Sequence, residues 1–151
     1  MKSVLAFLVL AVATFSANAA IFINNNTTCE AVLVLKAHDI NSPGICSYYS
    51  SRFPVAANTS MAFNNVTSLN TPGGPGWFSY INGSASLVTT ASAFDAVTIY
   101  YGDLFGAINF DIGSTGTCAP STTFSGSYPG CSLTNASWTN LGGGNILLEL
   151  N

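Results

Sequence analysis

The stretch that decides the fold is residues 94–112, FDAVTIYYGDLFGAINFDI, which has the pattern of a β-hairpin. Two runs rich in β-branched and aromatic residues flank the dipeptide Gly102-Asp103. A two-residue connection of this composition lets antiparallel strands reverse tightly. The predicted register therefore places Tyr101 opposite Leu104.

Side chains in this hairpin alternate between two faces on both strands. The apolar face comprises Val97, Ile99, Tyr101, Leu104, Ile108, Phe110 and Ile112. The more polar face comprises Thr98, Tyr100, Phe105, Ala107, Asn109 and Asp111. Because an apolar face this wide must be covered by a second layer, we expect the rest of the chain to supply one.

The remaining sequence also has the pattern of short strands. Residues 30–37 are apolar on both sides and indicate an interior strand, whereas Pro54 indicates an edge strand because it lacks an amide donor. Asn82-Gly83 indicates a second hairpin. About nine short strands without a helical period predict an all-β fold, a two-sheet antiparallel β-sandwich, with a closed barrel as the alternative.

The N-terminus has the pattern of a secretory signal peptide. Lys2 precedes an apolar run at 4–15 and the small residues Ala17-Asn18-Ala19. The run is shorter than the roughly 20 residues that a membrane-spanning helix needs. We therefore expect residues 1–19 to be cleaved and 20–151 to form a single domain that is secreted or held at the cell surface, without a membrane span.

Charged residues make up only 6 % of the sequence. After removal of residues 1–19, two basic residues remain, Lys36 and Arg52, against six acidic ones. Binding to nucleic acid or to anionic lipid requires clustered basic side chains, so neither is an expected partner. A surface of neutral amides and hydroxyls instead favours self-association.

Four cysteines, Cys29, Cys46, Cys118 and Cys131, predict disulfides in a secreted protein. Four cysteines allow three pairings. We favour Cys29 with Cys46 and Cys118 with Cys131, because each pair is close in sequence and encloses turn-forming residues. Zinc is not expected, since the chain has no C-x-x-C pair and a single histidine.

The usual acid, base and nucleophile residues are sparse, and we expect no enzyme, no cofactor and no metal site. His38 has Asp39 and Asn41 as neighbours, but no G-x-S-x-G motif accompanies it. The hairpin register predicts that Asp95 and Asp111 lie on opposite faces, which separates the best candidate carboxylate pair.

Aromatic side chains provide the candidate ligand-binding site. Trp77, Tyr100, Phe105 and Asn109 could form a platform on which a sugar stacks while the amide bonds its hydroxyls. Burial of the same rings in the core is the competing interpretation.

The leading functional hypothesis is a secreted, non-enzymatic structural or adhesive protein that assembles with itself into a homo-oligomer or filament. Its terminal strands, at 20–24 and 145–150, would pair with the edge of a partner, unless both pair within their own domain. The alternative hypothesis is a carbohydrate-binding module that recognises surface glycans.

Overall fold

A computed structural model describes residues 20–39, 43–70, 76–80, 88–89, 92–101 and 108–151, together with the backbone of 85–86. The predicted signal peptide at 1–19 lies outside the described residues, and so do both predicted turn dipeptides, at 82–83 and 102–103. No helical segment among the described residues is long and apolar enough to cross a membrane.

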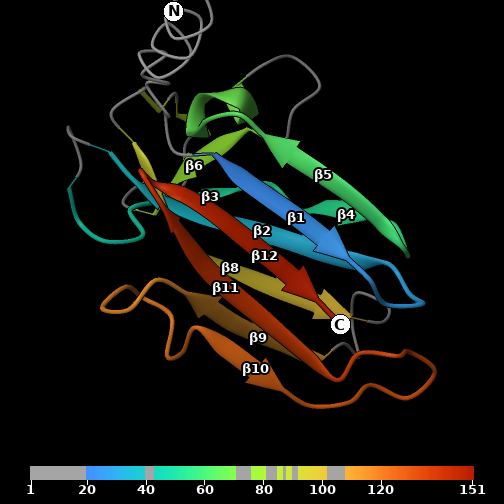
Figure 1. Cartoon of the computed structure of the whole chain (residues 1–151). Helices are drawn as coiled ribbons and strands as arrows, with labels where there is room; N and C mark the ends of the chain where they lie inside the picture. The colour runs from blue at the N-terminus through green and yellow to red at the C-terminus, as the bar shows by residue number, and fades with distance from the viewer. Residues whose placement is uncertain are drawn as a thin grey trace, which may run out of the picture.

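The described strands form two sheets (Figure 1). The five-stranded sheet has the order β10 (Thr123–Ser125), β11 (Asn135–Gly142), β12 (Asn145–Leu150), β1 (Ile21–Asn25) and β5 (Thr59–Phe63). The seven-stranded sheet has the order β7 (Ala85–Ser86), β6 (Trp77–Ser79), β3 (Tyr48–Ser50), β2 (Ala31–His38), β8 (Ala93–Tyr101) and β9 (Ile108–Gly113), with β4 (Phe53–Val55) also paired to β2. A short 3-10 helix, η1 (Val66–Asn70), precedes β6.

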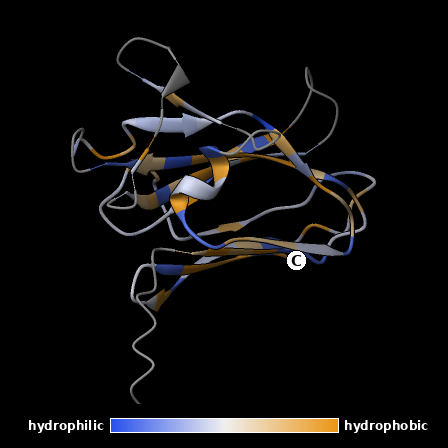
Figure 2. Ribbon diagram, turned by 90° about the horizontal axis from the view of Figure 1, so that it is seen from above, coloured by the Kyte–Doolittle hydropathy of each residue, from blue (hydrophilic) through white to orange (hydrophobic). Residues whose placement is uncertain are grey.

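The two sheets pack as layers, and hydrophobic and hydrophilic residues alternate along their strands (Figure 2). The core between them is formed by fully buried side chains from both sheets, among them Ile21, Ile23, Leu33, Leu35, Ile99, Ile112, Ile146 and Leu148. The predicted all-β, two-sheet sandwich is therefore confirmed, and the five-stranded sheet is the second layer that the central hairpin requires.

The central hairpin forms between β8 and β9, but its predicted register is wrong. Tyr101 pairs with Ile108 and not with Leu104, so β9 begins four residues later than predicted, whereas β8 ends at Tyr101 as predicted. An even-numbered shift leaves every side chain on the same side of the sheet. Val97, Ile99 and Ile112 are consequently buried on the predicted apolar face.

Both terminal strands are paired within the chain. β1 lies between β12 and β5, and β12 lies between β11 and β1. The β1–β12 pair is parallel, with Ile23 opposite Leu148, whereas the other pairs are antiparallel. The hydrogen-bonding edges of both terminal strands are thus occupied inside the domain, which is the arrangement given above as the alternative to pairing with a partner.

All four cysteines form disulfides, but the predicted pairing is wrong: the bonds are Cys29–Cys131 and Cys46–Cys118. Cys29 lies between β1 and β2, and Cys131 lies in the loop between β10 and β11. Because the sandwich stacks loops from distant parts of the chain at its ends, spatial proximity does not follow sequence proximity. Thr28 and Ser132 reinforce the first bridge, since each hydroxyl accepts a hydrogen bond from the other residue's amide, at 3.0–3.1 Å.

The first prediction concerns the Cys29–Cys131 bridge, which joins residues 102 positions apart. In the chain-entropy model a loop of this length stabilises the fold by about 4.7 kcal/mol. The double variant C29A/C131A should lose free energy of unfolding of that order in urea titrations. Peptide mapping of the wild type without reduction should yield a fragment that links Cys29 to Cys131, and a fragment linking Cys29 to Cys46 would contradict the pairing.

Candidate functional site

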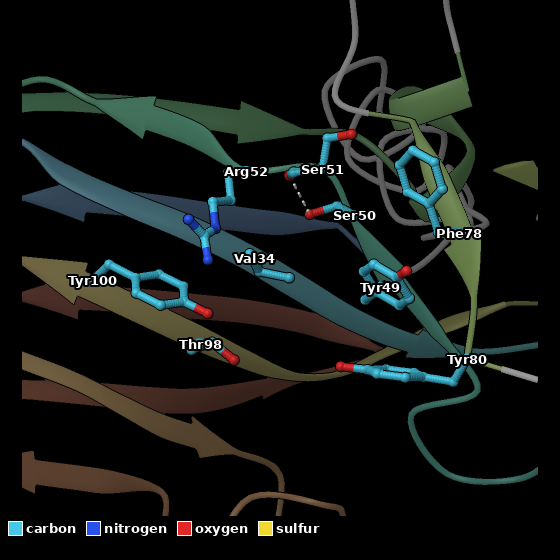
Figure 3. Close-up of a pocket in the computed structure, with 9 residues that line it drawn as sticks. All are labelled: Val34, Tyr49, Ser50, Ser51, Arg52, Phe78, Tyr80, Thr98 and Tyr100. Carbon is cyan, nitrogen blue, oxygen red and sulfur yellow. Dashed lines mark hydrogen bonds between the residues drawn. The ribbon is translucent and has the colours of Figure 1, made fainter. Parts of the chain in front are cut away.

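A shallow groove of about 440 Å³ lies on the outer face of the seven-stranded sheet, away from the core (Figure 3). Its floor is the paired residues Val34 of β2 and Thr98 of β8. Aromatic and polar side chains from neighbouring strands complete its walls: Tyr49, Ser50, Ser51, Arg52, Phe78, Tyr80 and Tyr100.

A break between two short strands places Arg52 in the groove. β3 and β4 both pair with β2, but the pairing is interrupted between Tyr49 and Phe53. At the break the buried Ser50 hydroxyl accepts a hydrogen bond from the backbone amide of Leu35, at 2.9 Å. It also donates a hydrogen bond to the Ser51 carbonyl, at 2.9 Å. Because the side chain satisfies the backbone there, the strand can interrupt its ladder without leaving a buried amide unpaired.

The aromatic rings are in mutual contact. The centroid of Tyr49 lies 4.4 Å from that of Tyr80 and 5.6 Å from that of Phe78. At the other side of the groove, the Arg52 guanidinium carbon stands 4.7 Å above the ring centroid of Tyr100, in a cation–π contact. These contacts hold the rings in place before any ligand arrives.

Polar groups point into the groove between the rings. In Figure 3 the hydroxyls of Tyr80 and Tyr100 both extend toward Thr98, from opposite sides. The Thr98 hydroxyl donates a hydrogen bond to Oδ1 of Asp111 at 2.5 Å. The same oxygen accepts a hydrogen bond from the Lys36 ammonium group at 3.0 Å. The negative charge of Asp111 beside the groove is therefore already balanced by Lys36.

The pKa of the Tyr80 phenol is raised above its usual value. Desolvation by burial is the main cause, and the negative charge of Asp111 adds to it. Because the ordinary pKa of a tyrosine, about 10, already lies well above neutral pH, the phenol is protonated there and can donate a hydrogen bond to a ligand.

A second, smaller hollow of about 260 Å³ lies beyond Tyr80. It is lined by Lys36, Ile45 and Tyr80 together with the two cysteines of the Cys46–Cys118 disulfide. Tyr80, which is 55 % exposed, thus borders both hollows.

The four residues of the predicted platform lie at different places in the structure. Tyr100 lines the groove, and Asn109 is exposed beside it on the neighbouring strand, directly opposite Tyr100 in the ladder. Phe105 lies outside the described residues. Trp77 does not belong to the platform, because it is 1 % exposed in the core and its indole nitrogen donates to the Val66 carbonyl at 3.0 Å.

The prediction failed for Trp77 because this residue lies on the inner face of β6. Trp77 and Ser79 face the core, whereas Phe78 and Tyr80 face outward. The prediction from the sequence also missed Tyr49, Phe78 and Tyr80 as groove residues. The one available signal was the even spacing of Phe78 and Tyr80, which places two rings on one face of a strand.

His38 and the carboxylates of Asp39, Asp95 and Asp111 are the side chains that the sequence analysis considers as catalytic groups. The His38 ring nitrogen Nδ1 lies 2.7 Å from one Asp95 oxygen, and the Cys46 amide donates to the other at 2.8 Å. Asp39 accepts hydrogen bonds from Thr89 and Ser92. These bonds tie loops to the sheet.

The prediction that Asp95 and Asp111 lie on opposite faces is wrong. Asp95 is the extra residue of a β-bulge in β8, and the bulge moves its side chain to the outer face. Asp95 there contacts His38, and Asp111 contacts Lys36, two positions earlier on β2. Among the described residues no three His, Cys, Asp or Glu side chains gather as a metal site.

Comparison with protein-family models, curated proteins and solved structures found no match for this chain. The groove itself is therefore the basis on which a function can be argued.

The second prediction tests which aromatic rings belong to the core. Trp77→Ala should cost about 3–5 kcal/mol of unfolding free energy, because it leaves a large cavity and removes a buried hydrogen bond. Tyr80→Ala, which truncates an exposed ring, should cost less than about 1 kcal/mol. Urea unfolding of both variants decides the assignment, and equal losses would contradict it.

Proposed function

We propose that this protein is a secreted, non-enzymatic adhesive protein that binds surface glycans in the groove on its seven-stranded sheet. The observation that carries the proposal is the gathering of Tyr49, Phe78, Tyr80 and Tyr100 around one outer hollow. Large aromatic side chains are usually buried, so a cluster of them on an outer face favours a binding role.

The chemistry of the groove suits a sugar. The exposed ring of Tyr80 offers a flat apolar surface for the C–H face of a pyranose. The hydroxyls of Tyr80 and Tyr100 provide donors and acceptors for sugar hydroxyls around it. Because the rings already contact one another, little side-chain entropy is lost on binding.

A binding role rather than a catalytic one is supported by the structural contacts that the titratable side chains make. His38, Asp39, Asp95 and Asp111 each take part in hydrogen bonds or ion pairs that hold strands and loops together. The two disulfides are compatible with an oxidising, extracellular environment.

The third prediction tests the groove directly. On a glycan array and by isothermal titration calorimetry, Tyr80→Ala and Tyr100→Ala should each weaken sugar binding by about tenfold, equivalent to about 1.4 kcal/mol. Phe22→Ala is the matched control, because Phe22 is an aromatic residue 44 % exposed on the other sheet. Absence of any bound glycan, or equal binding by all three variants, would refute the proposal.

Self-association is a second candidate function, favoured by the edge of β5. β5 lies at the end of the five-stranded sheet (Figure 1), and its sequence, TSMAF, contains neither a charged residue nor a proline. Natural proteins usually protect such edges with lysine, proline or a bulge. An unprotected edge can pair with the same strand of a second copy, so here β5 replaces the terminal strands as the pairing element.

The fourth prediction follows from this edge. Ala62 is exposed on β5, so Ala62→Lys should place a repelling charge in the contact and shift any oligomer to monomer without unfolding the domain. Sedimentation over a hundredfold concentration range measures the shift. A wild type that stays monomeric throughout would exclude self-association by this edge.

A further inference from the structure

The groove carries a positive charge that no carboxylate among the described residues neutralises. Lys36 is paired with Asp111, but within the described ranges the Arg52 guanidinium forms no ion pair with a carboxylate. The guanidinium instead makes a cation–π contact with the ring of Tyr100. In a chain with only two basic residues after position 19, a cation placed on an aromatic wall is a specific feature of this groove.

The contact with Tyr100 restrains the guanidinium, and among the described residues no side-chain hydrogen bond takes up its N–H donors. These donors lie in the plane of the group. A planar fork of donors matches a carboxylate, which it binds through two parallel hydrogen bonds. In Figure 3 the guanidinium reaches over the groove floor near Val34, on the side opposite Tyr80.

We infer that the groove selects an acidic sugar, a uronic or sialic acid unit whose carboxylate binds Arg52 while its ring lies against Tyr80. This inference rests on the proposed glycan-binding function and adds the substrate class. The floor residues Val34 and Thr98 lie between these two contacts, as Figure 3 shows. The Lys36–Asp111 pair keeps the other side of the groove close to neutral, so the charge at Arg52 dominates the selection.

The experiment uses the purified protein and a glycan array in which each carboxylated glycan has a neutral counterpart. Uronic acid oligomers are printed beside their methyl esters, and sialylated glycans beside their desialylated forms. The wild type should bind the acidic member at least tenfold more tightly than its counterpart, since hydrogen bonds between charged groups are stronger than neutral ones.

Variants of Arg52 separate charge from sugar binding. Arg52→Gln should abolish the acidic preference, so that this variant binds each acidic glycan no more tightly than its neutral counterpart. Arg52→Lys, which keeps the charge but loses the fork, should retain only part of the preference. Both changes lie at an exposed position, so the fold should tolerate them.

Each failure has a distinct meaning. Equal binding of acidic and neutral members, or an acidic preference that survives Arg52→Gln, overturns the inference while glycan binding stands. Tight binding of sulfated glycans in place of carboxylated ones overturns the assignment of the carboxylate. Absence of binding to every glycan on the array overturns the proposed function as well.

Discussion

The antiparallel pairing of β2 with β8 is the interaction on which the rest of the structure depends. It runs from Ala31–Tyr101 to His38–Ala93 with a single bulge, and it forms the middle of the seven-stranded sheet. On its inner side Leu35 and Val97 are fully buried against the five-stranded sheet. On its outer side Val34 and Thr98 form the groove floor, so one pair of strands supports both the core and the candidate site.

The disulfides and the bulge fasten the surrounding loops to this pair. Asp95, displaced outward by the bulge, binds His38 of β2 and the backbone of Cys46 in the following loop. Cys46 is in turn bonded to Cys118, which lies beyond β9. The hollow next to Tyr80 therefore has a covalently closed wall, and the loops that border the site are held by the same contacts that complete the sheet.

The aromatic groove is assembled from residues that are far apart in the chain. Tyr49, Tyr80 and Tyr100 come from different parts of the sequence, and Arg52 reaches them because β3 and β4 are separated by a short break. Alternation shows that a residue such as Tyr49 or Tyr80 lies on the same face of its strand as the residues two positions away. It does not show whether that face is turned toward the core. At β6 one face carries Trp77 and Ser79 and the other carries Phe78 and Tyr80, so each face has an aromatic residue and packing against the second sheet decides between them.

The sequence by itself determined the all-β class, the positions of most strands and the two faces of the central hairpin, because alternation of side chains is a local property of an extended chain. Strand 145–150 was predicted with its observed bounds, and its alternation places Ile146, Leu148 and Leu150 on one face, which the structure buries. Only the tertiary structure decided the hairpin register, the disulfide partners, the burial of Trp77 and the contact of Arg52 with Tyr100. These depend on which strands become neighbours and which loops meet at the ends of the sandwich, and long-range packing sets both.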